Sequence, residues 1–299
     1  MTGAARRREN TVDVAARQHW RQQLGRFGVW RSVTQVTPDL AAHLERLGFG
    51  ALWLGSSPGA DLRIVAELLG ATSRLVVATG IVNMWDSDPH EVAASFARIE
   101  SAYPGRFLLG VGAGHREATR QYGKPYDTMA RYVDALTAGG VPGGSVVLAA
   151  LGPRMLRLAA ERTAGAHPYL VPVAYTSHAR SLVGPEPLIA TEHKAVLEAD
   201  PRAARAIGRP RVRRPYLGLV NYTSNLRRLG WGDDDLADPG SDALIDALVA
   251  HGDPGQVAAQ LTGHLTAGAD HVCVQLLTGE GADVIDGYRR LAAGLGLEG

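Results

Sequence analysis

From residue 27 onward, short apolar runs alternate with longer stretches in which apolar residues recur at three- and four-residue spacing. Short apolar runs are typical of buried strands, and the spaced stretches are typical of amphipathic helices. The pattern predicts strands at residues 26–30, 51–54, 75–82, 107–111, 145–150, 166–171, 187–190 and 271–276. The chain is therefore predicted to contain eight strands.

The stretches between these strands carry helix signals. The clearest start is Thr37 as N-cap with Pro38 at the first helical position. Helices are predicted at residues 38–47, 61–70, 88–103, 126–138, from 153 onward, 242–250, 254–267 and 282–295. Between about residues 202 and 240 the alternation fails, although residues 216–230 look helical and Asp233 to Asp235 form an acidic turn. This segment is predicted to be an insertion over one end of the fold.

Eight strand-and-helix units in a chain of 299 residues predict a (β/α)8 TIM barrel rather than an open sheet. We place one domain at residues 25–299 and a polar N-terminal extension at residues 1–24, whose helix at 13–24 would lie across the foot of the barrel. The chemistry of such barrels lies on the loops after the strands. Those loops are residues 55–59, 79–86, 112–115, 151–154, 167–169 and 278–281.

Composition narrows the class of partner. The formal net charge is +1, and no basic stripe is interleaved with aromatic residues, so we expect a small-molecule substrate and no nucleic acid. Cys273 is the one cysteine and lies in an apolar run, which predicts a small buried side chain and excludes an internal disulfide. No apolar run approaches the roughly 20 residues of a membrane span, so we expect a cytoplasmic protein without a membrane partner. The sequence is also compatible with a homodimer.

Two histidines follow predicted strands. His115 comes directly after the strand at 107–111 and the small residues Gly112, Ala113 and Gly114. Imidazole exchanges protons near neutral pH, but on this stretch alone a histidine that bonds a neighbouring loop is the favoured interpretation. His167 ends the sixth strand and would face the same barrel mouth.

Other motifs have weaker support. Residues 55–59 match the G-x-S-x-G nucleophile elbow, with Ser57 as nucleophile, but Pro58 lacks the backbone N–H that the oxyanion needs. The glycines at 110–114 lack the spacing of a dinucleotide fingerprint. Because no H-E-x-x-H and no Cys/His cluster occurs, we expect no protein-bound catalytic metal. A helix beginning at Gly152 and Pro153 fits an anion site and an ordinary connection equally well.

Four segments, taken in order, make the chain recognisable. They are Thr79-Gly80-Ile81-Val82-Asn83 and residues 106–114, 150–155 and 271–275. This order resembles the luciferase-like monooxygenase superfamily. It looks most like the branch of oxidoreductases that use the deazaflavin coenzyme F420, which is common in actinobacteria. The resemblance covers residues 27–295, and the Gly-Arg-Phe-x-Leu-Gly-Val-Gly block at 105–112 is its most specific part.

The resemblance implies a TIM barrel that holds a flavin-like ring at the carboxyl ends of its strands, with a non-prolyl cis peptide at Gly80–Ile81. Gly112 to Gly114 and Leu151 to Arg154 would hold the phosphate-bearing chain of the cofactor, which favours the anion-site interpretation. The residues implied for the cofactor are Thr79, Gly80, Ile81, Asn83, Gly112, Ala113, Gly114, Leu151, Gly152, Pro153 and Arg154.

His115 stands where some relatives carry an acidic proton donor, so it becomes the first catalytic candidate, with His167 as the second. Aromatic and polar side chains near the strand ends would form the substrate pocket, namely Trp53, Ser56, Trp85, Tyr169 and Tyr222.

The predicted function is an F420-dependent oxidoreductase that transfers a hydride between the deazaflavin and a small organic substrate. The nearest alternative is an FMN-dependent luciferase-like monooxygenase. A serine hydrolase that uses Ser57 is disfavoured, and a barrel that binds its cofactor without turnover is a further alternative.

Overall fold

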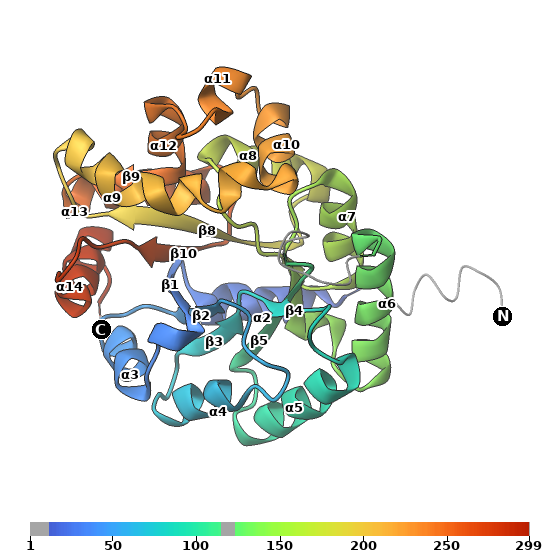
Figure 1. Cartoon of the computed structure of the whole chain (residues 1–299). Helices are drawn as coiled ribbons and strands as arrows, with labels where there is room; N and C mark the ends of the chain where they lie inside the picture. The colour runs from blue at the N-terminus through green and yellow to red at the C-terminus, as the bar shows by residue number, and fades with distance from the viewer. Residues whose placement is uncertain (1–11, 115–122, 299) are drawn as a thin grey trace.

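The computed structural model describes residues 12–114 and 123–298. Its centre is a closed parallel barrel in which the strands follow the order β10-β1-β2-β3-β5-β6-β7-β8, and β8 pairs with β10 to close the ring (Figure 1). The strands of this ring are β1 (Phe27–Ser32), β2 (Ala51–Gly55), β3 (Val76–Thr79), β5 (Phe107–Gly112), β6 (Val146–Leu148), β7 (Gly165–Ala166), β8 (Leu188–Val196) and β10 (His271–Leu276). The predicted eight-stranded TIM barrel is confirmed.

Helices surround the barrel. Those of the first half are α3 (Pro38–Arg46), α4 (Arg63–Gly70), α5 (Pro89–Ala102), α6 (Pro125–Ala138) and α7 (Pro153–Arg162). Those of the second half include α8 (Val173–Val183), α12 (Asp242–Leu248), α13 (Pro254–Thr266) and α14 (Val284–Leu295). The Thr37 hydroxyl accepts from the Leu40 backbone N–H at 3.2 Å, and Pro38 begins α3, as its start signal predicts. In the described part of the chain, no helix is long and apolar enough to cross a membrane.

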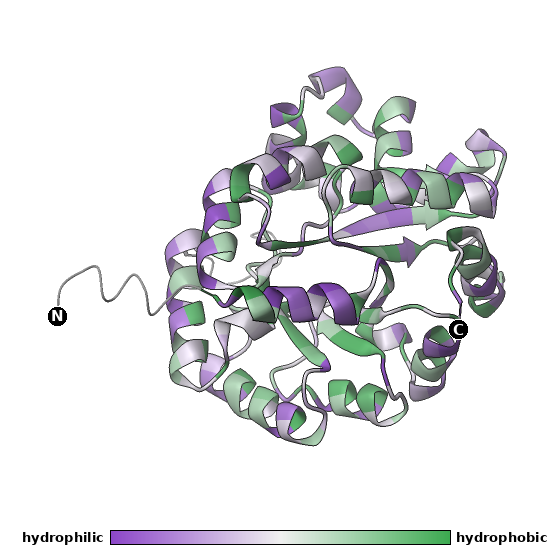
Figure 2. Ribbon diagram, turned by 180° about the vertical axis from the view of Figure 1, so that it is seen from behind, coloured by the Kyte–Doolittle hydropathy of each residue, from purple (hydrophilic) through white to green (hydrophobic). Residues whose placement is uncertain are grey.

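The helix α2 (Val14–Leu24) closes the amino end of the barrel, as predicted for residues 13–24. Seen from behind, it crosses the barrel opening (Figure 2). Trp20 and Leu24 are buried against apolar side chains of the barrel interior, and the Trp20 indole N–H donates to the Gly144 carbonyl at 2.6 Å. The buried Cys273 belongs to the same cluster, also as predicted. With its floor sealed in this way, the barrel is open to ligands at its carboxyl end.

Two strands differ from the predicted bounds in the second half. The sixth strand was expected at residues 166–171, but β7 ends at Ala166 because the chain turns inward there, with Leu170 in the left-handed region at φ 54°. The seventh was expected to end at residue 190, yet β8 continues to Val196 and stays buried throughout. Its polar residues Glu192 and Lys194 form an ion pair inside the barrel, so an apolar pattern could not mark its end.

Several elements were missed or given other bounds. The apolar pattern gave no helix between the sixth and seventh strands, where α8 lies. A helix predicted at 242–250 ends at Leu248, because β9 (Val249–His251) pairs with the last residues of β8. The third strand, predicted at 75–82, is divided into β3 and the short β4 (Val82–Asn83). The Gly80–Ile81 peptide between them is cis, as the resemblance implied.

The segment predicted as an insertion is helical. It contains α9 (Pro201–Arg213), the 3-10 turn η4 (Tyr216–Gly218), α10 (Val220–Arg228) and α11 (Asp233–Leu236). The three aspartates therefore form a short helix and not a turn. Three buried residues of this segment, Tyr222, Leu226 and Leu236, share an apolar cluster with Leu170 and Leu277, which follow barrel strands. The insertion is thereby fixed over one side of the carboxyl end.

Candidate active site

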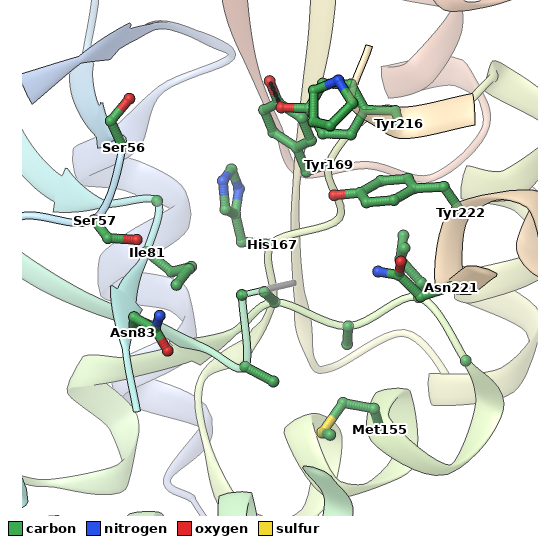
Figure 3. A pocket seen from close by; sticks show the side chains of 18 of the residues that line it. Ser56, Ser57, Ile81, Asn83, Met155, His167, Tyr169, Tyr216, Asn221 and Tyr222 are labelled. Atoms are coloured by element: carbon green, nitrogen blue, oxygen red, sulfur yellow. Dashed lines mark hydrogen bonds between the residues drawn. The ribbon is translucent and has the colours of Figure 1, made fainter. Parts of the chain in front are cut away.

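A pocket of about 500 Å3 opens at the carboxyl ends of the strands (Figure 3). Strand ends, the loops that follow them and the insertion all contribute to it. The lining residues are Trp30, Ser56, Ser57, Gly80, Ile81, Asn83, Ala113, Gly114, Ala149, Ala150, Leu151, Gly152, Met155, His167, Tyr169, Pro215, Tyr216, Asn221 and Tyr222. A volume of this size suits a small organic molecule together with part of a cofactor.

His167 lies in the middle of this pocket, between the two groups of side chains that Figure 3 labels. Its Nδ1 lies 2.8 Å from the Ala190 carbonyl oxygen, so Nδ1 carries the ring proton. The imidazole stacks on Trp53 with ring centroids 4.3 Å apart. Burial lowers the pKa of His167 to about 4, and the neighbouring His271 contributes. At neutral pH the ring is uncharged, and its Nε2 offers a lone pair.

The floor of the pocket is built closely around Gly80. A Cβ on this residue would lie 2.9 Å from His167 Nε2 and 3.0 Å from Trp30 Nε1. Gly55 makes room for the Trp30 ring, because a Cβ there would lie 1.9 Å from Cζ2 of the indole. His167 Nε2 and Trp30 Nε1 are buried and have no hydrogen-bond partner within the described residues.

A hydrogen-bonded network supports the tyrosine side of the pocket. The Lys194 ammonium donates to a Glu192 carboxylate oxygen and to the Tyr169 hydroxyl, each at 3.0 Å. Tyr169 donates to Gln275 Oε1 at 3.0 Å and accepts from the Tyr216 hydroxyl at 3.0 Å. The Lys194 and Glu192 side chains are 1% and 0% exposed. Burial raises the pKa of Tyr216 to about 12, so this hydroxyl stays protonated at neutral pH.

The structure brings together most of the residues predicted for this site. Those that line the pocket are Gly80, Ile81, Asn83, Ala113, Gly114, Leu151, Gly152, His167, Ser56, Tyr169 and Tyr222. Their roles remain predictions. Because they come from strands and loops far apart in the sequence, only the closure of the barrel makes them neighbours.

Four residues predicted to hold the cofactor lie outside the lining. The Thr79 hydroxyl is fully buried and joins the Gly110 carbonyl and N–H, each at 2.8 Å. A Cβ on Gly112 would lie 2.6 Å from Ile81 Cγ1, so Gly112 faces the side chain of that pocket residue. Pro153 begins α7, and the exposed Arg154 stacks its guanidinium 4.4 Å from the Tyr126 ring centroid. Contact of these four residues with a ligand stays a prediction.

Two predicted substrate residues also lie elsewhere. Trp53 is 0% exposed and lies beneath His167, with its N–H donating to His271 Nε2 at 3.1 Å. It supports the His167 ring from below, and its role toward a substrate stays a prediction. Trp85 donates to the Ala113 carbonyl at 2.9 Å and is not among the residues that line the pocket. Its indole links the loop after β4 to the loop after β5.

Sequence analysis missed several residues of the pocket, above all Trp30, Tyr216, Asn221 and Met155. Trp30 lies within β1, where the apolar pattern marks it as core. Tyr216 and Asn221 belong to the insertion, whose position no local pattern reveals. A search for aromatic residues throughout that segment would have found Tyr216 as well as Tyr222.

Two catalytic candidates, His115 and Ser57, remain to be placed. His115 lies outside the described residues, so its role stays a prediction. Ser57 lines the pocket with a backbone φ of 50°, but within residues 12–114 and 123–298 no hydrogen bond joins it to a histidine. The serine hydrolase alternative therefore gains no base from the described part of the chain. No group of three or more metal-ligating side chains occurs there either.

The architecture and the first half of the sequence both match known proteins. A family model described as luciferase-like monooxygenase matches residues 24–140. The F420-dependent secondary alcohol dehydrogenase, solved with an F420–acetone adduct, superposes with a TM-score of 0.68 at 15% identity over 90% of this chain and 98% of its own. Residues 24–140 thus resemble the luciferase-like monooxygenase family. This confirms the resemblance that the motifs indicated.

Other similar proteins are monooxygenases, and one of them was solved with FMN. The 4-hydroxyprotoasukamycin monooxygenase of Streptomyces nodosus subsp. asukaensis is 30% identical over 122 residues, and limonene 1,2-monooxygenase of Rhodococcus erythropolis is 32% identical over 83. These segments cover 37% and 25% of this chain, and 31% and 21% of the relatives' own lengths. The oxygenating constituent of 3,6-diketocamphane monooxygenase from Pseudomonas putida, solved with FMN, has a TM-score of 0.61 at 16% identity over 91% of this chain and 96% of its own.

His167 Nε2 and Trp30 Nε1 have no hydrogen-bond partner within the described residues, so each could bond a bound group. Both nitrogens lie close to Gly80, which has no side chain to contact them. Gly152 faces open space, since a Cβ there would meet nothing within 4 Å.

Proposed function

We propose that this chain is an oxidoreductase that transfers a hydride between coenzyme F420 and a small organic substrate. The observation that carries the proposal is the neutral imidazole of His167, buried in the pocket with its Nε2 lone pair unpartnered. Hydride transfer to or from an oxygen-bearing carbon must be accompanied by movement of a proton, and an imidazole aimed into the pocket can accept it. The likeness to an F420-dependent dehydrogenase supports the same choice.

Residues around Gly80 and Ile81 would hold the ring of the deazaflavin, and Gly114, Leu151 and Gly152 would border its phosphate-bearing chain. When bound, the cofactor supplies or accepts the hydride. The chain's own residues position the substrate, exclude water and exchange the proton at His167 Nε2. His115 remains a second proton donor in this proposal.

The decisive experiment compares F420 and FMN binding to purified protein by fluorescence titration. We expect micromolar affinity for F420 and at least about tenfold weaker affinity for FMN. Failure of F420 to bind would contradict the proposal. A parallel pair of variants, His167→Ala and His115→Ala, separates the proton donors: loss of turnover by about 10²-fold or more, with F420 affinity retained, marks the residue that moves the proton.

A second candidate is an FMN-dependent monooxygenase. It is favoured by the two monooxygenases that share sequence with part of the chain and by the FMN complex that shares its fold. Oxygen consumption with reduced FMN and a substrate panel would support it. Tight FMN binding without F420 binding would replace the first proposal with this one.

A further inference from the structure

Four aromatic rings follow one another along one side of the pocket. They belong to Trp30, Tyr169, Tyr216 and Tyr222, which all line the cavity, and we call them the aromatic wall. In this order the centroids of neighbouring rings lie 5.2, 5.4 and 5.0 Å apart, and their planes are inclined by 51°, 45° and 71°. The residues come from β1, from the loop after β7, from η4 and from α10. The wall therefore joins the barrel to the insertion.

The hydroxyl groups in the middle of the wall bond to the protein. The Tyr169 hydroxyl donates to Gln275 and accepts from Lys194 and from Tyr216. Because a phenol hydroxyl has one donor and two acceptor positions, that of Tyr169 has none left for a ligand. Tyr216 directs its one hydroxyl proton to Tyr169. These two residues therefore offer a ligand mainly their rings.

The other side of the cavity is mostly aliphatic. Figure 3 shows Ile81 and Tyr222 on opposite sides of it. The small or apolar residues that line the cavity away from the wall include Ile81, Ala113, Ala149, Ala150, Leu151 and Met155. A bound molecule thus meets aromatic rings on one side and aliphatic side chains on the other.

The inclined rings of the wall favour one kind of neighbour. Aromatic rings prefer to meet at an angle or with an offset, so that the positive edge of one ring faces the negative face of the next. The Tyr216 and Tyr222 rings, inclined by 71°, have this arrangement. A further aromatic ring extends the same row of contacts. A saturated ring of equal size has no such face and gains burial alone.

We propose that the substrate of this pocket carries a planar aromatic ring, and that this ring packs against Tyr216 and Tyr222. That the bound molecule is a substrate rests on the proposed function, whereas the binding of an aromatic ring to the wall does not. Both tyrosines belong to the insertion, so the insertion selects the class of molecule that the barrel accepts.

The wall is in place before a ligand arrives. Tyr169 is held by its bonds to Lys194 and Gln275, and it holds Tyr216 in turn. Tyr222 is 6% exposed and packs in the apolar cluster that fixes the insertion. Because rings that are already ordered lose little conformational freedom on binding, their preference for an aromatic partner is expressed in the affinity.

Two amides of matched size test this preference. We would titrate purified protein, without added cofactor, with benzamide and with cyclohexanecarboxamide, and follow each ligand by saturation-transfer NMR. The two share the amide group and the number of carbons, so they differ in the planar ring. We expect benzamide to bind at least about fivefold more tightly. Equal affinities, or tighter binding of the saturated amide, would overturn the proposal.

Variants of the two tyrosines separate the ring from the hydroxyl. Tyr216→Leu and Tyr222→Leu should each reduce the preference for benzamide, and the double variant should bring it to within about twofold. Tyr216→Phe and Tyr222→Phe keep the rings and should keep the preference. Tyr103→Leu, at the C-terminal end of α5 and outside the pocket lining, is the control and should change neither affinity. An undiminished preference in the double leucine variant would contradict the assignment.

A further measurement on the wild type needs no variant that folds. Intermolecular nuclear Overhauser effects would be recorded between benzamide and protein in which tyrosine alone keeps its ring protons. We expect contacts between the benzamide ring and tyrosine rings. Their absence, with benzamide bound, would overturn the proposal even if the leucine variants failed to melt cooperatively.

A last titration separates substrate from cofactor. If saturating F420 leaves benzamide bound, the wall serves the substrate. If F420 displaces benzamide competitively, the wall holds the cofactor and the proposal fails. If F420 does not bind at all, the proposed function fails, while the preference for benzamide still decides whether the wall selects aromatic rings.

Discussion

The two halves of the barrel differ in what they bury. In the first half, β3 and β5 are buried and almost entirely apolar, and α5 and α6 cover them with apolar side chains. In the second half, β8 buries four consecutive polar residues, Thr191 to Lys194, and Figure 2 shows this strand in polar colour among apolar neighbours. The first half buries mainly apolar side chains, whereas β8 of the second half also buries the Glu192–Lys194 ion pair.

This difference explains why hydropathy predicts the strands of the first half better than those of the second. Apolar burial is a property of each strand by itself. A buried charge is tolerated only when a partner from another position neutralises it. Glu192 accepts from the Leu170 N–H and pairs with Lys194, and His193 Nδ1 lies 2.9 Å from His264 Nε2. Four stability measurements test whether buried polar groups matter more in the second half than in the first.

Acid should destabilise the protein through the second half. Burial is the main cause that lowers the pKa of His167, His264 and His271 to about 4. Each binds fewer protons folded than unfolded, where the pKa is about 6.5, so its contribution to stability is lost as the pH falls from about 6.5 toward 4. Between pH 7 and 5 we expect a loss of about 2 kcal/mol for each of the three.

Urea unfolding at several pH values measures this loss. His178→Gln, which replaces an exposed histidine of α8, is the control and should leave the pH dependence unchanged. A free energy of unfolding that stays constant between pH 7 and 5 would show that the buried histidines do not govern stability.

Breaking the buried ion pair should have the next largest effect. Lys194→Met leaves the Glu192 carboxylate buried without its partner, and we expect a loss of about 3–5 kcal/mol in the free energy of unfolding. The double variant Glu192→Gln/Lys194→Met removes both charges and should recover part of this loss. If the single and double variants unfold at the same urea concentration, pairing is not what makes these charges tolerable.

A polar contact of the first half should matter less. The Glu45 carboxylate accepts from the backbone N–H groups of Ser73, Arg74 and Leu75 at 2.5 to 3.1 Å, and these bonds keep the pKa of Glu45 low despite desolvation. Glu45→Ala should cost about 2 kcal/mol, because it leaves several donors at the start of the third strand without an acceptor. Glu45→Gln keeps one accepting oxygen and should fall in between. Denaturant midpoints of the three proteins provide the measurement, and an Ala variant as stable as the wild type would contradict it.

The smallest effect concerns local structure alone. Thr37→Ala removes the N-cap of α3 and should cost about 1 kcal/mol, whereas Thr37→Ser keeps the hydroxyl and should cost a few tenths. Thermal melts of the pair would test it. A larger loss for the serine variant would mean that the methyl group, and not the cap, stabilises this helix.

Much of the fold could be predicted because its signals are local. Thr37 and Pro38 mark a helix start, and the run at 107–111 identifies β5 to within one residue at its end. By contrast, the length of β8 depends on Lys194 meeting Glu192, and β9 exists only because β8 continues far enough to pair with it. The unpredicted α8 follows the inward turn at Leu170, whose backbone is fixed by Glu192.

In the candidate site, too, some residues could be predicted from local signals and others depend on distant contacts. His167 was found because it follows a predicted strand, where ligands meet a barrel of this kind, whereas Gly80 and Ile81 were found through the resemblance. Trp30 was missed because a buried aromatic residue within a strand has the same local pattern whether it faces the core or a pocket. The positions of Trp53 and Thr79 beneath the lining likewise depend on the curvature of the whole barrel.

The sequence by itself determined the eight strands of the barrel, the end at which its loops gather and the likeness to luciferase-like proteins. These follow from periodicity, helix caps and motifs, and each of these signals lies within a short stretch of the sequence. The approach of His167 Nε2 and Trp30 Nε1 to Gly80 depends on the tertiary structure. Three distant strands and loops must close into a ring before those atoms meet, and no local pattern specifies that distance.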